Sequence, residues 1–182
     1  MSKVYAPRSI KEWKKSTFPR RELLGARSVF STDDQPSWRN ILFFGHIPWI
    51  YEHKVAVNAV FPAVGYITIA VEAARQISAG DAGDRIQNLQ VGHAMVLDRY
   101  STVEMITSLW RCGGWYNFNV SSHTGVPWVE HCSGRIRRGS SFSCRRRGPL
   151  EGSNSPDLTH SIDVIKWYQT LAKTGVDYGA SF

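Results

Sequence analysis

His53 is the residue whose type and position most directly suggest chemistry. It lies nine residues before Pro62, where an apolar stretch of helical periodicity begins. Because the unperturbed pKa of histidine is about 6.5, its imidazole can take up and release a proton near neutral pH. The N–H groups that begin a helix, here near Pro62 to Gly65, lack intrahelical acceptors and can polarise a carbonyl oxygen. The spacing therefore indicates a general base beside a carbonyl-binding helix start, although His53 alone also fits a histidine hydrogen-bonded within a core or hairpin.

Other polar residues are weaker candidates for a reaction. His131 and Cys132 are adjacent in an expected strand, so their side chains should point to opposite faces, with Cys132 in the core. Asp98 follows a strand and Glu72 lies in the helix; either could supply an acid, but a capping or solvated role is favoured for both. No metal site is predicted, because no ligand partners at suitable spacing accompany the remaining histidines, His46, His93 and His123.

The composition is that of a globular chain with reduced thiols. Of its 182 residues, 42% are hydrophobic and 12% are aromatic, which suffices for one buried core and a tail. No run approaches the roughly 18 uncharged apolar residues of a membrane span, and the N-terminus lacks the apolar stretch of a signal peptide. The three cysteines are odd in number and have no short paired spacing. We therefore expect a cytoplasmic protein with no membrane contact, disulfide framework or zinc ribbon.

The formal net charge of +7 is concentrated in two parts of the chain. Basic residues gather between Lys11 and Arg21 and again between Arg135 and Arg147. Neither cluster alternates with aromatic residues on a helical face, and neither belongs to a helix-turn-helix, zinc-finger or ribonucleoprotein pattern. Solvated segments are the favoured interpretation and a docking surface for an acidic partner is the second, so no nucleic-acid binding is predicted.

The order of the expected elements indicates an α+β fold. A polar extension (1–37) precedes a strand at 38–44, and a buried helix starts at Pro62 and ends before a turn at 78–84. Four strands with short antiparallel links follow at 86–97, 102–110, 115–122 and 127–138. These are the elements of a hotdog fold, in which an antiparallel sheet wraps around one long central helix. We place this domain at 38–138, a Gly/Ser/Arg-rich linker at 139–158 and a last segment with a helix at 159–182.

Several short stretches resemble the dehydratase domains of polyketide synthases, particularly the highly reducing fungal type. The family's His-x-x-x-Gly-x-x-x-x-Pro motif is matched by His53 and Pro62, and the following helix, AVGYITIAVEAA, is also similar. Further matches in the family's order are LLGAR, WRNIL, IPWI, WYNFNVSS, WVEHCSGRI and GVDYGASF. The sequence departs from the pattern at three places, which are Val57 for glycine, Arg21-Glu22 for His-Pro, and Ala180 for proline.

The resemblance implies removal of water from a β-hydroxyacyl thioester, with His53 as the base that takes the α-proton. The reaction also needs an acid to protonate the leaving hydroxyl group, which in the family is an aspartate from the second half of a double hotdog. We therefore interpret 159–182 as the start of a truncated second hotdog and expect the acid to lie outside these residues. The substrate contacts implied at the matched positions are Val57, Pro62, Gly65, Tyr178 and Gly179.

The resemblance also implies partners, and two alternatives stay open beside it. The substrate would be held on the phosphopantetheine arm of an acyl carrier protein, with no cofactor bound directly. The chain would pair with a second hotdog or form a homodimer. One alternative is an isomerase or cyclase of a polyketide intermediate, in which His53 moves a proton without an acid partner. The other is a catalytically vestigial docking domain, suggested by Val57 and the missing acid.

Overall fold

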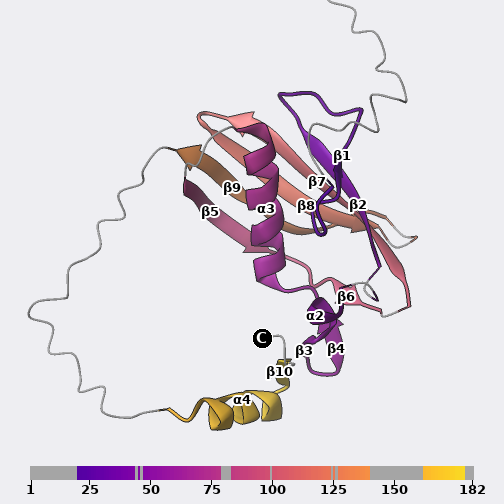
Figure 1. The fold of residues 1–182 in the computed structure, drawn as a ribbon, viewed down its shortest axis with the longest axis vertical. Coiled ribbons are helices and arrows are strands. Elements are labelled where there is room, and N and C mark those ends of the chain that lie inside the picture. Colours follow the sequence, from indigo (N-terminus) through magenta and orange to yellow (C-terminus); the bar gives the residue numbers. More distant parts are fainter. Residues whose placement is uncertain are drawn as a thin grey trace, which may run out of the picture.

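The computed structural model describes residues 20–43, 45, 47–78, 83–98, 100–123, 125, 127–139 and 162–178. The expected linker falls outside these residues apart from its first position, and His46 and Gly179 fall outside them as well. Two antiparallel sheets and one long helix make up most of the described part of the chain (Figure 1). Within that part, no helix combines the length and the apolar character that crossing a membrane requires.

The larger sheet has six antiparallel strands among the described residues. In spatial order these are β1 (Ala26–Arg27), β2 (Ser37–Phe43), β7 (Thr102–Cys112), β8 (Trp115–His123), β9 (Val129–Gly139) and β5 (Gly83–Val91). Gly113 and Gly114 both have a positive φ, of 53° and 77°, and they form the tight turn between β7 and β8. Every second residue of β7 points inward and is buried, namely Val103, Met105, Thr107 and Leu109.

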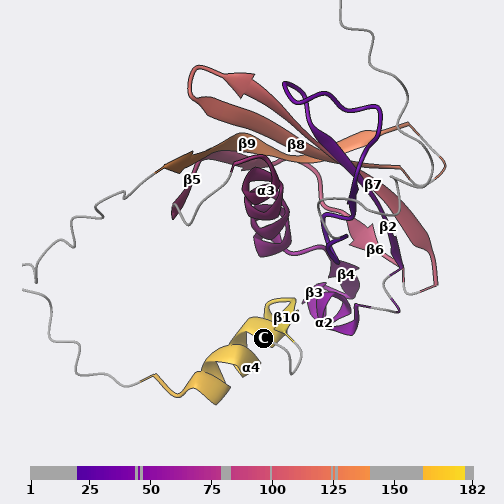
Figure 2. The ribbon, with the colours of Figure 1, turned by 45° about the horizontal axis from the view of Figure 1, so that its top comes forward.

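The long helix α3 (Ala63–Ile77) lies against one face of the larger sheet, which curves around it (Figures 1 and 2). Its buried residues recur at helical spacing and are Gly65, Tyr66, Ile69, Ala70, Ala73 and Ala74. They join one core cluster with sheet residues such as Leu109, Phe118 and Ile136. The expected helix and its apolar stripe are therefore confirmed, with Pro62 as the N-cap immediately before the first turn.

The smaller sheet lies at the N-terminal end of α3 (Figure 1). Among the described residues its four strands are, in order, β10 (Val176–Tyr178), β3 (His53–Val55), β4 (Asn58–Val60) and β6 (Val96–Leu97). The short helix α2 (Pro48–Tyr51) leads into β3, and α4 (Val164–Lys173) leads into β10. A strand from 159–182 thus completes the same sheet as the His53 hairpin, while the assignment of this segment to a second hotdog remains a prediction.

The fold begins before the boundary expected at residue 38. Leu23 and Leu24 are buried in the core, and β1 pairs with β2. Gly25 has a φ of 79°, and a Cβ atom at this position would lie 2.6 Å from the Cβ of Asn40. The expected polar extension is therefore wrong for residues 23–37, because the Leu-Leu-Gly sequence supplies two core side chains and a tight turn.

The strand expected at 86–97 is two strands that belong to different sheets. β5 ends at Val91, and β6 covers only Val96 and Leu97. The N–H of Gly92 still donates to the carbonyl of His131 at 3.0 Å, after which the chain crosses to the smaller sheet. The expectation of one strand was wrong because the apolar pattern of 86–97 does not reveal that its first part pairs in one sheet and its last part in another.

Candidate active site

His53 begins the short hairpin that leads into α3. The imidazole is half-buried, and its Nδ1 lies 2.8 Å from the carbonyl oxygen of Val60 on the facing strand. Because a carbonyl oxygen can only accept, Nδ1 donates and carries the proton of the neutral ring. Nε2 is then the ring nitrogen with the lone pair that can take up a proton. The hairpin therefore holds His53 in the tautomer that a general base requires.

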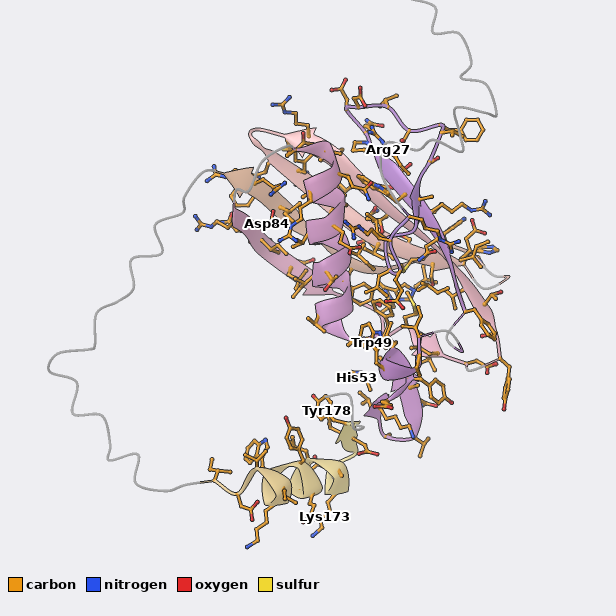
Figure 3. All side chains as sticks on the ribbon, in the orientation of Figure 1. Arg27, Trp49, His53, Asp84, Lys173 and Tyr178 are labelled. Carbon is orange, nitrogen blue, oxygen red and sulfur yellow. The ribbon has the colours of Figure 1, made fainter. Side chains whose placement is uncertain are left out.

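Tyr178 lies against His53 although the two residues are far apart in the sequence. The strand register pairs Tyr178 of β10 directly with His53 of β3, and paired residues point to the same face of a sheet. The ring centroids are 5.5 Å apart and the ring planes meet at 63° (Figure 3). The structure therefore brings together two residues predicted for the site, whereas Gly179, predicted beside them, lies outside the described residues.

Pro62 and Gly65 are both buried at the start of α3, where the sequence predicted substrate contacts. The N–H of Gly65 donates to the carbonyl of Pro62 at 2.9 Å, so this amide is already engaged. The amides of Ala63 and Val64 occupy the first helical turn, where intrahelical acceptors are lacking. A Cβ atom at Gly65 would lie 2.8 Å from Cζ of Phe61, so close packing explains the glycine. Among the first amides of α3, those of Ala63 and Val64 therefore remain as candidates for polarising a carbonyl oxygen.

Val57 lies at the tip of the hairpin, and 88% of its side chain is exposed. The left-handed backbone conformation that favours glycine falls one residue earlier, at Ala56, which has a φ of 56°. The backbone at position 57 therefore does not require the glycine of the motif. A contact between Val57 and the substrate remains a prediction. The high exposure of Val57 does not support it.

The two carboxylates considered from the sequence, Asp98 and Glu72, each have interactions of their own. Asp98 Oδ1 accepts from the N–H of Tyr100 at 3.0 Å, which confirms a capping role in the turn after β6. Glu72 lies roughly 13 Å along α3 from Ala63, at 1.5 Å per residue. Burial raises the pKa of Glu72, while Arg21 and Arg75 oppose this rise. Neither carboxylate is therefore placed as an acid partner of His53.

A buried pair of polar side chains, Ser122 and His131, was missed by the sequence patterns. The register of β8 and β9 shifts next to His131, so that both His131 and Cys132 are buried. The predicted core position of Cys132 is confirmed, but the expected opposite orientation of the two residues is wrong because of this irregularity. His131 Nδ1 donates to the carbonyl of His93 at 3.0 Å, and Nε2 accepts from Ser122 Oγ at 2.7 Å.

The electrostatics of this buried cluster favour neutral groups. Burial lowers the pKa of His131 and raises the pKa of Cys132 to about 11, so the thiol is not activated as a nucleophile. The ring of Tyr66 stacks on His131 at 6.5 Å, and its hydroxyl is buried without a hydrogen-bond partner among the described residues. The sequence offered one signal for this pair, because Ser122 is a polar residue at an inward position of an alternating strand and therefore needs a buried hydrogen-bond partner. Within the described ranges, no three His, Cys, Asp or Glu side chains are grouped to hold a metal ion.

Comparison with known proteins assigns the family. The family model of the polyketide synthase dehydratase domain matches residues 21–123. The highly reducing polyketide synthase VdtX of Byssochlamys spectabilis is 39% identical over 183 residues, covering 100% of this chain and 8% of VdtX. The highly reducing polyketide synthase g433 of a Fusarium species is 37% identical over 183 residues, covering 96% of this chain and 7% of g433. The chain belongs to the polyketide synthase dehydratase domain family and spans only a small part of the length of these relatives.

Solved structures of similar shape confirm the fold. The dehydratase domain from the CurF module of curacin polyketide synthase superposes with a TM-score of 0.77 at 19% identity, covering 89% of this chain and 59% of that domain. The dehydratase domain from the CurK module gives a TM-score of 0.75 at 20% identity, covering 87% of this chain and 57% of that domain. The expected α+β hotdog fold is therefore confirmed.

Proposed function

We propose that this chain supplies the general base for dehydration of β-hydroxyacyl thioesters in polyketide biosynthesis. The observation that carries the proposal is the fixed imidazole of His53, whose Nδ1 donates to the Val60 carbonyl at 2.8 Å. This bond makes Nε2 the basic nitrogen, at the entrance to the central helix of a dehydratase-family fold. The alternative is a histidine that only stabilises the hairpin. The position of His53, at the histidine of the family's motif ahead of Pro62, favours the catalytic role over that structural one.

In the proposed reaction, Nε2 of His53 takes a proton from the α-carbon of the thioester. The electron pair of that C–H bond forms the double bond between the α- and β-carbons, and the β-hydroxyl leaves as water once it is protonated. The amides of Ala63 and Val64 stabilise the negative charge that develops on the thioester oxygen, as donors at a helix start can. Each group thus acts where charge changes in the transition state.

The acid that protonates the leaving hydroxyl is proposed to come from a segment outside this chain. Asp98 is engaged in a turn, and Glu72 is set back along α3 among Arg21 and Arg75. In agreement with this proposal, the chain covers only 59% of the solved dehydratase domain from CurF. We further propose that the substrate arrives on the phosphopantetheine arm of an acyl carrier protein in the cytoplasm, without a directly bound cofactor.

The first test replaces the proposed base. In a protein that also contains the segment proposed to carry the acid, His53→Gln should lower the rate of enoyl product formation by roughly 10² to 10⁴, the usual loss when a proton-transfer group is removed. His123→Gln is the matched control, because His123 is a half-buried histidine at the end of β8. Product is measured by mass spectrometry, and folding by circular dichroism. Full turnover by a folded His53→Gln variant would remove His53 from the mechanism.

An isomerase is the second candidate, because Asp98 is engaged in a turn and Glu72 lies in α3 beside Arg21 and Arg75. Moving a double bond in an enoyl thioester needs a base but no leaving-group acid. Incubating a protein that also contains the acid-bearing segment separately with β-hydroxyacyl and enoyl thioesters distinguishes the two reactions. Loss of water from the first substrate supports a dehydratase, whereas double-bond migration in the second without loss of water from the first supports an isomerase. A vestigial docking domain would turn over neither substrate.

A further inference from the structure

Helix α4 and strand β10 form a short unit that is attached to the His53 hairpin. The carboxylate of Asp163 caps the helix by accepting from the N–H groups of Ile165 and Lys166, at 3.0 and 3.3 Å. Gly175 has a φ of 90°, which lets the chain turn directly from the helix into β10. The carbonyl of Gly175 accepts from the N–H of Ala56 at the tip of the hairpin. The backbone therefore fixes α4 relative to the strand that carries His53.

Three aromatic rings lie in a row from α4 to the proposed base. The ring of Tyr168 meets the ring of Tyr178 edge-on, with centroids 6.0 Å apart and planes at 80°. Tyr178 in turn meets His53 with centroids 5.5 Å apart, and Figure 3 shows it between the hairpin and α4. Both distances and angles lie in the range that aromatic rings prefer for edge-to-face contact. Tyr178 is thus held between a ring of α4 and the imidazole.

We propose that Tyr168 is a positioning residue for His53 and acts through Tyr178, an inference that rests on the proposed function. The hydrogen bond from Nδ1 to Val60 fixes one atom of the imidazole, and the Tyr178 ring packs against the imidazole from a second side. The Tyr178 ring limits the tilt of the imidazole, and Tyr168 limits the movement of Tyr178. Together they hold Nε2 in one direction, which proton abstraction requires.

Because Tyr168 is partly exposed, a positioning role can be distinguished by substitution from a general contribution to stability. Its side chain is 44% exposed, so its removal deletes little core packing. Trp167 precedes it on the same helix and is 53% exposed, which makes it a matched control. Consecutive residues of a helix do not face the same side, so Trp167 does not share the direction of Tyr168. If substitution at position 168 affects His53 and substitution at position 167 does not, the effect is transmitted through the contacts of Tyr168 with Tyr178 and of Tyr178 with His53.

The structural test is nuclear magnetic resonance of this chain with isotope-labelled histidine. The signals of His53 are assigned by their loss in the His53→Gln variant, and nitrogen shifts show which ring nitrogen carries the proton. Tyr168→Ala should shift the His53 ring signals and raise the fraction of the tautomer protonated at Nε2. Tyr168→Phe, which keeps the ring, and Trp167→Ala should leave the His53 signals unchanged.

The kinetic test separates orientation from binding. In a protein that also contains the acid-bearing segment, Tyr168→Ala should lower kcat for a β-hydroxyacyl thioester by about 3- to 10-fold, the scale of one aromatic pair, with KM little changed. Tyr168→Phe should retain the original kcat. Unchanged His53 signals in Tyr168→Ala, or an equal shift in Trp167→Ala, would overturn the inference. Full turnover by His53→Gln would instead overturn the proposed function. Failure of the Tyr168 inference and failure of the proposed function are therefore distinguished by different measurements.

Discussion

Ala56 has a backbone conformation that opposes its own side chain. Its φ of 56° lies in the left-handed region, which costs a residue with a Cβ atom about 1 to 2 kcal/mol. Ala56→Gly should relieve this strain and, after the added chain entropy of glycine, raise the free energy of unfolding by about 0.5 to 1 kcal/mol. Urea denaturation followed by tryptophan fluorescence measures the change.

Val57→Gly is the matched control for this substitution. Val57 is the next residue of the same turn, and its φ is not positive. Glycine there should bring no gain in stability, although it restores the glycine of the dehydratase motif. If Val57→Gly stabilised the chain and Ala56→Gly did not, the strain would have been assigned to the wrong residue.

His131 should make stability depend on pH. Burial lowers the pKa of the folded-state imidazole, with the His93 carbonyl opposing this shift. The unfolded chain then binds more protons than the folded chain below the ordinary histidine pKa of about 6.5. The contribution of His131 is therefore fully present above about pH 6.5 and is lost progressively as the pH falls below it.

The measurement is the urea midpoint of the protein between pH 5 and pH 8. The midpoint should fall toward pH 5, and His131→Gln should flatten this slope even though it breaks the bond to Ser122. His123→Gln should keep the slope. A slope that survived in His131→Gln would assign the pH dependence to other groups.

The sequence predicted part of the candidate site at the scale of single residues. His53, Pro62 and Tyr178 were predicted because they lie in stretches that follow one another in the order of the family. The structure places His53 and Tyr178 side by side, while the roles of all three residues remain predictions. The Ser122–His131 pair could not, because it depends on a shift of register between β8 and β9. A shift of one residue changes which side chains face the core, and only the pairing of the strands determines it.

At the scale of elements, the end of α3 meets the larger sheet beside a buried ion pair between β9 and β5. Arg138 of β9 donates to the carbonyl of Ser78 at 2.6 Å, and its Nε lies 3.0 Å from Asp84 Oδ1. Only 9% of each side chain of the pair is exposed. Arg75 of α3 adds a second contact to Asp84, at 3.2 Å. These bonds connect the helix, β5 and β9 at one corner of the fold.

Asp84→Asn should therefore destabilise the chain strongly. Removing one charge leaves the buried guanidinium of Arg138 without its counter-ion, a change that typically costs about 3 kcal/mol. Asp33→Asn is the matched control, because its pair with Arg27 is at 2.8 Å but the Asp33 side chain is 99% exposed. This control should change stability by less than about 1 kcal/mol in thermal or urea unfolding. Equal effects of the two substitutions would show that burial does not determine how much an ion pair contributes to the stability of this chain.

The elements themselves follow from local patterns, whereas their partners do not. The alternation in β7 and the helical period of α3 are properties of neighbouring residues, and both elements were predicted from them. The division of 86–97 between two sheets and the pairing of β10 with β3 join distant segments. Such contacts depend on the whole fold, so the sequence pattern of one segment does not contain them.

At the scale of the whole molecule, α4 presents an uncovered apolar surface. Figure 2 shows that α4 lies away from the larger sheet, and no residue of this helix is buried. The side chains that are more than half exposed include Ile162, Val164, Ile165 and Trp167. Contiguous exposed apolar surface of a few hundred Å² usually marks an interaction site. In a solution of this chain alone, a second copy is the partner present at the highest concentration.

We therefore expect the 182-residue chain to self-associate as its concentration rises. Val164→Lys combined with Ile165→Lys should shift the mass measured by light scattering toward that of the monomer, because burying two charges at the contact is costly. Val29→Lys is the matched control, since Val29 is 51% exposed in the loop between β1 and β2 and should not change the mass. A monomer at every concentration would show that α4 does not drive association. A self-associated double variant would place the contact elsewhere, with the outer edge of β5, which pairs with no other described strand, as the next surface to test.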